Sequence, residues 1–251
     1  MADSRWQIEN DEWQMTNDND ERLSLDWLPF LLQTADALFP TGAYAHSLGF
    51  EEIVRFGMVK DERSLGEFLH AQVIPALRQH ELPYLRYACE AAREGNLAEL
   101  RRLDAEISAW KLAAETRSAS AQLGTRRLKA LRTISDAPLL AAYDTLIARN
   151  VCAGHHLVVC GLQAAIERIP LEAALAAYFY QSLAALAAAA LKLIRIGQDG
   201  VQRALRSANV EAQKAIQASL LVPRADAGWF NPLLEIASMR HERAFERLFI
   251  S

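Results

Sequence analysis

Residues 173–191 read AALAAYFYQSLAALAAAAL, nineteen positions without a charged side chain. A run of this length could span a bilayer or form a helix surrounded by other helices. Alanine gains little from transfer into lipid, and Gln181 and Ser182 place polar groups in the middle of the run. The stretch therefore favours a buried helix whose small side chains let neighbouring backbones approach closely.

Helix boundary signals recur on both sides of this run. They lie at Ser64–Glu67, Glu94–Asn96, Ser135–Pro138, Pro170, Gly197 and Pro223. Ser64–Glu67 has the form of a capping box that opens a helix, and residues 201–221 predict one uninterrupted helix. The single strand candidate, His156–Val159, is short and compatible with a helix. The sequence predicts an all-α, single-domain bundle of about eight to ten helices, with the alanine-rich helix buried at its centre.

The charge distribution divides the chain unevenly. Residues 1–22 mix acids, asparagine and glutamine with little periodicity, which predicts a disordered acidic leader. Residues 23–222 are expected to form the helical domain, and residues 223–251 a loop followed by a tail. Beyond the leader the basic residues are scattered, whereas a nucleic-acid groove needs clustered lysine and arginine. The pattern therefore favours solvated helix faces and excludes nucleic acid as a partner.

The cysteines and the absent motifs indicate a compartment and exclude some chemistry. Three cysteines in 251 residues do not suggest a disulfide framework, and no secretion signal opens the chain. We therefore expect a reducing, cytoplasmic location. Neither G-x-x-x-x-G-K-[ST] nor G-x-G-x-x-G occurs, so the chain is not expected to bind a nucleotide by itself.

Residues 39–52, FPTGAYAHSLGFEE, contain A-x-S-x-G around Ser47. This differs at one position from G-x-S-x-G, the motif of the serine elbow in α/β hydrolases. An elbow needs a buried strand that leads into a sharp turn. Here Pro40, Thr41 and Gly42 form a turn signal after a helix-like segment, and no oxyanion loop precedes the serine. A hydrolase using Ser47 remains an alternative, but the sequence favours a protein without catalytic residues.

The same stretch has the composition of a docking surface. Three- and four-residue spacing places Tyr44, Ser47, Leu48 and Glu51 on one predicted helical face, with His46 beside them. Tyrosine supplies a large contact area with a polar tip, so a face of this kind suits a protein partner.

Residues 150–161, NVCAGHHLVVCG, offer a second possible site. Cys152, His156 and Cys160 repeat every four residues, and His155 is close by, so a zinc or nickel site on one helix is an alternative. The apolar neighbours favour an interior helix with hydrogen-bonded histidines instead. We therefore expect no resident metal and no cofactor.

Three blocks resemble the UreF urease accessory proteins. They are PTGAYAHSLGFEE, the glycine-histidine block 154–161 with the alanine-rich helix and LIRIGQDGVQ, and the closing segment IASMRHE with RLF. Together they extend over about residues 28–251. Two positions depart from the family pattern: Glu235 replaces a frequent aspartate, and Arg195 stands where proline is common.

The resemblance implies an all-α, non-enzymatic and commonly dimeric protein. Such a protein joins a UreD/UreH-type accessory protein and the GTPase UreG in a complex that delivers nickel to the urease apoprotein. The GTPase would supply the nucleotide chemistry.

The resemblance also suggests two docking surfaces. The tail is expected to bind the UreD/UreH-type protein, unless it packs back on its own bundle, through Ser238, Met239, Arg240, His241, Glu242 and Arg247. The surface expected to recruit the GTPase consists of Pro40, Gly42, Tyr44, His46, Ser47, Glu51, Tyr180 and Gln198.

Overall fold

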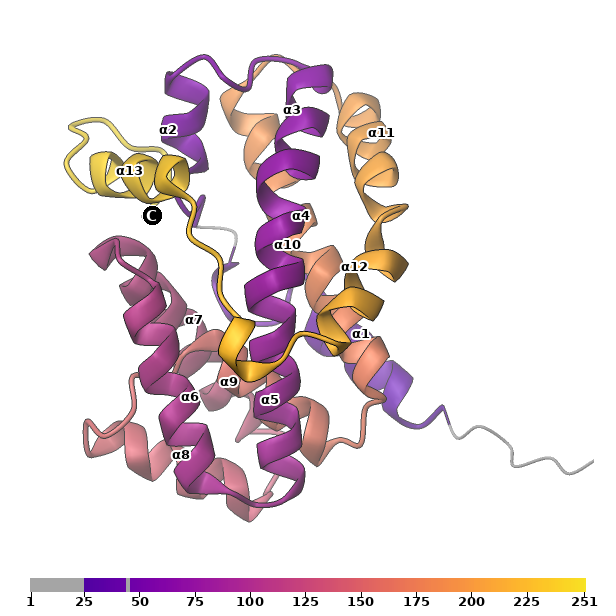
Figure 1. Ribbon diagram of the computed structural model, residues 1–251, viewed down its shortest axis with the longest axis vertical. Coiled ribbons are helices and arrows are strands. Elements are labelled where there is room, and N and C mark those ends of the chain that lie inside the picture. The colour runs from indigo at the N-terminus through magenta and orange to yellow at the C-terminus, as the bar shows by residue number, and fades with distance from the viewer. Residues whose placement is uncertain (1–24, 44–45) are drawn as a thin grey trace, which may run out of the picture.

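The computed structural model describes residues 25–43 and 46–251, and within these ranges it contains helices and no strand (Figure 1). The all-α prediction is confirmed. The leader predicted over residues 1–22, like Tyr44, lies outside the described residues.

One long rod runs from Glu62 to Arg93 and forms the axis of the bundle. It consists of α3 (Glu62–Phe68), α4 (Ile74–Ala76) and α5 (Leu82–Arg93), joined by π-helical turns at Leu69–Val73 and Leu77–Glu81. Pro75 and Pro83 lie within the rod, where each lacks the N–H that an α-helix needs. The wider π turns lie just before each proline, so the rod accommodates both without breaking.

The rod begins earlier than the sequence predicts. Asp61 is the N-cap: its carboxylate accepts from the Ser64 N–H at 2.8 Å, while Ser64 Oγ accepts from the Asp61 N–H at 3.1 Å. Ser64 is therefore the third residue of the capping box, and the prediction that Ser64 and Glu67 form the box is wrong.

The buried centre of the bundle is α5 packed against α9. The chain continues through α6 (Leu97–Trp110), α7 (Ala114–Leu131), α8 (Pro138–Ala148) and α9 (His156–Ile166), and α9 lies between α5 and α7. A Cβ added at Gly161 of α9 would lie 2.5 Å from Ala88 Cβ and 2.7 Å from the Cys89 nitrogen on α5. Glycine therefore sets the close approach of these two helices, and the strand candidate at His156–Val159 is part of α9.

The alanine-rich helix α10 (Leu171–Leu193) is not at the centre. It is long and apolar enough to cross a bilayer by length and composition alone, but 39% of its most apolar window is buried in the bundle. Phe179 and Leu183 face the interior, whereas Tyr180, Ala188 and Leu191 are exposed. The prediction of a buried central helix is therefore not confirmed, because α10 covers the core with one face only.

The segment after Gly197 also differs from its prediction. It contains two helices, α11 (Gln198–Asn209) and α12 (Ala212–Leu220), which separate at Val210 and Glu211. No proline or glycine marks this break in the sequence.

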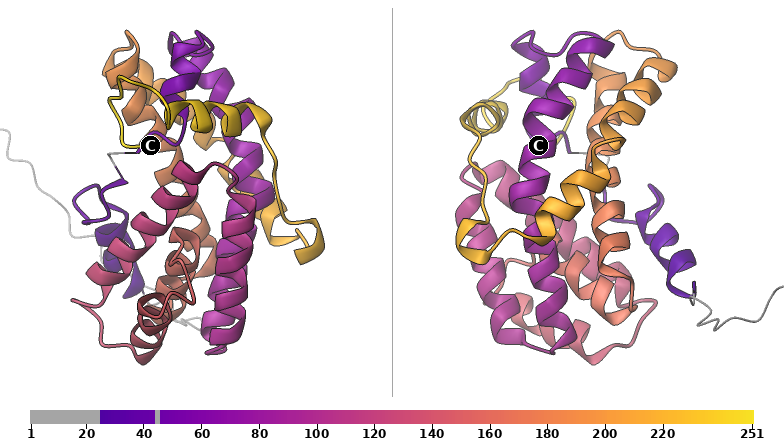
Figure 2. Two further views of the ribbon diagram at one scale, coloured as in Figure 1. Left: turned by 90° about the vertical axis from the view of Figure 1, so that its left-hand side faces the viewer. Right: turned by 45° about the vertical axis from the view of Figure 1, so that its right-hand side comes forward.

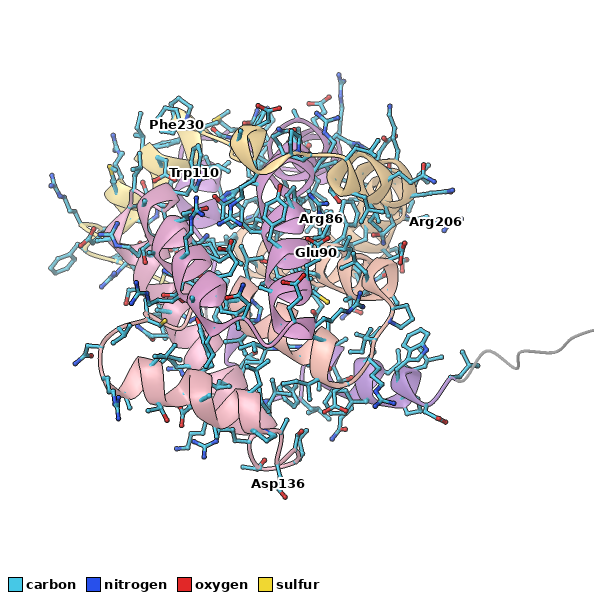
Figure 3. The ribbon with its side chains drawn as sticks, turned by 60° about the horizontal axis from the view of Figure 1, so that its bottom comes forward. Arg86, Glu90, Trp110, Asp136, Arg206 and Phe230 are labelled. Atoms are coloured by element: carbon cyan, nitrogen blue, oxygen red, sulfur yellow. The ribbon has the colours of Figure 1, made fainter. Side chains whose placement is uncertain are left out.

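A strap, residues 221–231, carries the chain from α12 across the rod to α13. The Val222 carbonyl accepts from Arg86 at 2.6 Å and from the Tyr87 hydroxyl at 2.8 Å, and the Gly228 N–H donates to the Gln79 carbonyl at 3.0 Å. Figure 3 views this side and labels Arg86 on the rod. The strap therefore fixes where the last helix begins.

Three short helices complete the fold: α1 (Trp27–Ala35), α2 (Phe50–Arg55) and α13 (Pro232–His241). Helix α13 packs against α2 and α7, and the chain after it turns back to the same place (Figure 2). Residues 46–55 and the C-terminal segment, far apart in sequence, therefore meet at α2.

Candidate interaction site

The site is the junction between residues 46–52 and the C-terminal segment. Residues 46–49 are not helical, so the helical face predicted for this stretch is wrong; α2 begins at Phe50. Gly49 has φ +85°, and a Cβ there would lie 2.5 Å from Ser238 Oγ. Glycine is needed at this position both for the backbone conformation and for contact with α13.

Glu51 is the central acceptor of the junction. It is 4% exposed, and its carboxylate accepts from His241 Nε2 and from the N–H groups of Leu248 and Phe249, each at 3.1 Å. Burial alone would raise the pKa of Glu51. The hydrogen bonds from Leu248, His241 and Phe249 outweigh that effect and lower the pKa below its ordinary value. Glu51 therefore stays ionised and holds the tail by its backbone.

His241 connects a third helix to this junction. Its ring is fully buried, and Nδ1 lies 3.0 and 2.9 Å from the two carboxylate oxygens of Glu115 on α7. Arg247 also donates to Glu115, at 3.2 Å. One histidine thus joins α2, α7 and α13.

The last described residue closes the junction. The Ser251 hydroxyl lies 2.6 Å from His46 Nδ1, and the Ser251 carbonyl accepts from the N–H groups of Ser47 and Leu48. Burial, with a smaller contribution from the positive charge of Arg126, lowers the pKa of His46, so this ring is neutral.

The structure does not support a catalytic Ser47. Its side chain is fully buried, and Oγ lies 3.5 Å from the Glu51 N–H at the start of α2. The described residues place no strand beneath it, so the scaffold of a hydrolase elbow is missing from this part of the chain.

The metal alternative fails on geometry. Helix α9 starts at His156, so Cys152 lies in the preceding loop and the three side chains do not share one helix face. His156 Nε2 and Cys160 Sγ are 3.5 Å apart, while the His155 ring bonds two serine hydroxyls. Across residues 25–43 and 46–251, no group of three or more His, Cys, Asp or Glu side chains is arranged to hold a metal ion.

The residues predicted for partner binding separate into two groups. Those buried in the junction are His46, Ser47, Glu51, Ser238 and His241. Those exposed are Pro40, Tyr180, Gln198, Met239, Arg240, Glu242 and Arg247, and Gly42 is half-buried. Within residues 25–43 and 46–251, neither Tyr180 nor Gln198 makes a hydrogen bond or ring contact with a residue of the junction.

Sequence reasoning missed Glu115 and Ser251. Glu115 belongs to no recognisable motif and lies near the start of a helix, where an acid usually faces solvent. Only its meeting with His241, 126 positions away, shows its role.

The outer side of the junction is partly apolar and partly cationic. A shallow hollow is lined by Glu52, Arg55, Phe56, Arg240, Arg243 and Ala244. The Arg240 guanidinium lies 5.1 Å from the centre of the Phe56 ring. Beyond the hollow, Phe245, Leu248 and Ile250 project from the tail into solvent.

A helical bundle in which a buried polar cluster joins its own segments and leaves apolar side chains exposed has the features of a protein-interaction module. The UreF family model matches residues 59–209. Over 221 residues the chain is 36% identical to Urease accessory protein UreF of Arthrobacter sp. (strain FB24), which covers 88% of this chain and 96% of the relative. The same named protein of Bacillus sp. (strain TB-90) is 30% identical over 221 residues, covering 88% of this chain and 97% of the relative. The chain belongs to the UreF family of urease accessory proteins.

Proposed function

We propose that this protein is a non-catalytic scaffold, active as a cytoplasmic homodimer. It bridges a UreD/UreH-type accessory protein and a UreG-type GTPase during nickel insertion into urease apoprotein. Family membership supports the role in urease maturation. The bridging role is what the family resemblance implies, and the exposed side chains beside the junction support it.

The observation that carries the proposal is the geometry of the tail. Glu51 binds the tail by the backbone of Leu248 and Phe249, which leaves Phe245 fully exposed and Leu248 60% exposed. Large apolar side chains held outward by a buried anchor are typical of a protein-binding surface. The UreD/UreH-type protein is the proposed occupant, with Met239, Arg240, Glu242 and Arg247 at the rim.

This surface can be tested without disturbing the anchor. The double variant Phe245→Ser, Leu248→Ser keeps the backbone hydrogen bonds to Glu51 but removes the apolar surface. We expect affinity for the purified UreD/UreH-type protein to fall at least tenfold in isothermal titration calorimetry. Leu221→Ser is the matched control, because Leu221 is 83% exposed in the strap and lies outside the proposed surface.

Equal affinity for the double variant and the control would exclude this face. A chain truncated before Ala237 then checks the rest of the tail, since full affinity without residues 237–251 would refute tail docking entirely.

The GTPase surface is a second part of the proposal. His46, Ser47 and Glu51 are buried, so they support this surface rather than contact the GTPase, whereas Pro40 is exposed. Tyr44, which lies outside the described residues, is proposed as a contact together with Pro40, and Tyr180 and Gln198 are proposed as contacts on α10 and α11.

Interfaces usually depend on a few central residues, often tyrosine. Tyr44→Ala should therefore weaken GTPase capture by on the order of 2 kcal/mol. Val210→Ala, at an exposed apolar position outside the proposed GTPase surface, is the control. If Tyr44→Ala captures the GTPase as well as the control does, while its circular dichroism is unchanged, this assignment is wrong.

A further inference from the structure

Arg224 of the strap is seated among four side chains that come from α5 and α6. Its Nε donates to Glu106 at 3.0 Å, and its Nη1 donates to Glu99 at 2.7 Å. The guanidinium carbon lies 5.1 Å from the centroid of the Tyr87 ring and 5.8 Å from that of Tyr84. These four residues, Tyr84, Tyr87, Glu99 and Glu106, are called the cage below. Its two carboxylates and two aromatic rings both attract a guanidinium.

The cage is held in place by contacts within α5 and α6. Tyr84 and Tyr87 are buried, and their ring centroids are 5.8 Å apart. The Tyr84 hydroxyl donates to Glu106 at 3.1 Å and accepts from Trp110 Nε1 at 3.0 Å. Arg102, one turn before Glu106 on α6, donates to the other Glu106 oxygen at 3.1 Å. None of these contacts involves the strap, so the bundle itself sets the geometry of the cage.

The placement of the two carboxylates favours a guanidinium over an ammonium. Glu106 and Glu99 accept from different nitrogens of one planar group. A lysine ammonium carries its three donors on a single nitrogen and has no flat face to stack on a ring. Burial alone would raise the pKa of Glu106, but the hydrogen bond and charge of Arg224, with smaller contributions from Tyr84 and Arg102, lower that pKa. An ionised carboxylate therefore faces the cation.

A second ion pair shows what the cage adds. Arg203 on α11 donates to both carboxylate oxygens of Glu62 on α3, at 2.9 and 2.6 Å. The Arg203 side chain is 65% exposed, against 29% for Arg224, and no aromatic ring contact is found for Arg203 within the described residues. Exposed pairs of this kind are weak. Arg203 is therefore a matched control for Arg224.

We propose that the cage is an arginine-binding site: the bundle forms it, it selects a guanidinium, and Arg224 is the occupant that the chain itself supplies. Through Arg224 the site holds the strap, which fixes where α13 begins. The ligand class is the guanidinium group, so a free guanidinium compound should bind when the Arg224 side chain is removed. The site is a property of the single chain, and its test does not involve the partners proposed above.

The test vacates the cage and offers the ligand from solution. Methylguanidinium chloride is titrated into Arg224→Ala at constant ionic strength, with methylammonium chloride as the comparison. The indole N–H of Trp110, which donates to Tyr84, is followed by ¹H–¹⁵N nuclear magnetic resonance. We expect a saturable shift whose half-saturation lies at least tenfold lower for methylguanidinium, because only this cation is planar and forked. The unsubstituted chain should show no saturable shift, since Arg224 fills the cage.

Two further variants separate the cage from a general effect of the cation. Methylguanidinium should raise the melting temperature of Arg224→Ala but not that of Arg203→Ala, whose vacated carboxylate has no ring beside it. Adding Glu99→Gln to Arg224→Ala should raise the half-saturation concentration at least fivefold, because one of the two carboxylates is lost.

If circular dichroism shows that Arg224→Ala does not fold, Arg224→Gln takes its place, since its neutral side chain fills more of the cage. Three results would overturn the proposal. They are a folded variant without a saturable shift, equal half-saturation for the two cations, and an equal rise in melting temperature for Arg203→Ala.

Discussion

Two buried carboxylates, Asp104 and Glu51, accept hydrogen bonds from backbone N–H groups in different parts of the molecule. Asp104 on α6 accepts from the N–H groups of Ala153, Gly154 and His155, and from the Tyr143 hydroxyl, at distances of 2.6–3.0 Å. Glu51 on α2 accepts from two backbone N–H groups and the His241 ring. Each carboxylate holds a segment without regular structure on the helical bundle.

The two joints differ in what covers them. In the segment held by Asp104, Cys152, Gly154 and His155 are buried in the bundle, although Val151 and Ala153 are exposed. The segment held by Glu51 has its anchor buried but Phe245, Leu248 and Ile250 in solvent. Burial adds to the hydrogen bonds of Asp104, so the segment that it holds is expected to open only when the bundle unfolds. The tail held by Glu51 is expected to open locally, while the bundle stays folded.

The largest expected effect is the loss of the Asp104 joint. Asp104→Ala leaves the Tyr143 hydroxyl and three N–H groups, two of them on the buried residues Gly154 and His155, without an acceptor, at about 1–3 kcal/mol for each buried group. We expect the free energy of unfolding, measured with urea, to fall by about 4 kcal/mol or more. Asp104→Asn keeps one acceptor oxygen and should lose less. A loss below about 1 kcal/mol for Asp104→Ala would show that this joint is not structural.

Mild acid should distinguish the two joints. Burial lowers the pKa of His155 to about 4 and that of His156 to about 3. Below about pH 6.5 the unfolded chain binds protons that these rings do not, so stability falls by up to about 1.4 kcal/mol per pH unit for each ring.

The hydrogen bonds of Glu51 to the tail should be lost only at a lower pH. Its pKa is lowered, so its contribution is complete above the ordinary value near 4.3 and is lost only as the pH falls through the lowered value. Because burial lowers the pKa of His80 to about 3 as well, urea unfolding at pH 6.5 and 5.5 should show a loss of about 1 kcal/mol for each of the three rings, about 3 kcal/mol in total, while the Leu248 amide stays protected from exchange. Constant stability between these pH values would contradict neutral buried histidines.

Removal of the Glu51 carboxylate should have a smaller global effect. Glu51→Ala releases the tail, and the exposed side chains lose little on release, so we expect the free energy of unfolding to fall by about 2 kcal/mol. Exchange of the Leu248 and Phe249 amides should rise to nearly the rate of an unfolded peptide. If these amides stay protected in Glu51→Ala, the tail is held by other contacts and the comparison with Asp104 fails.

Gly49→Ala should give the smallest change of the series. The residue has φ +85° and its Cβ would approach Ser238 Oγ at 2.5 Å, so the hydroxyl must move or α13 must shift. We expect a loss of about 1–2 kcal/mol from strain in the left-handed conformation. Gly57→Ala is a useful control, because it has φ +72° but no atom near its Cβ. Equal losses for both variants would show that contact with Ser238 costs nothing.

Part of this fold could be predicted from sequence. Asn96 caps α6 after Gly95 with φ +66°, and Pro138 begins α8, both as predicted. Such signals act over one helical turn, so their effect is contained in adjacent residues. The break between α11 and α12 had no such signal and was not predictable.

The tail shows a similar division. The sequence predicts a loop followed by a docking tail over residues 223–251. The structure has a helix at Pro232–His241, capped by Asn231, and a non-helical remainder bound by backbone N–H groups. A residue bound through its backbone leaves no pattern in side-chain spacing. The sequence singled out the polar residues Ser47, Glu51, Ser238 and His241, but it did not predict that they are buried contacts within the protein.

Sequence alone determined that the described chain is helical, where α6, α8, α10 and α11 begin, and which two blocks carry unusual polar residues, because propensity, capping and periodicity are local properties. Tertiary structure alone decided that α10 lies at the surface, that Glu115 faces His241 and that Glu51 holds the tail. Those contacts join residues more than 100 positions apart, and their energy comes from burial that exists only once the helices have packed.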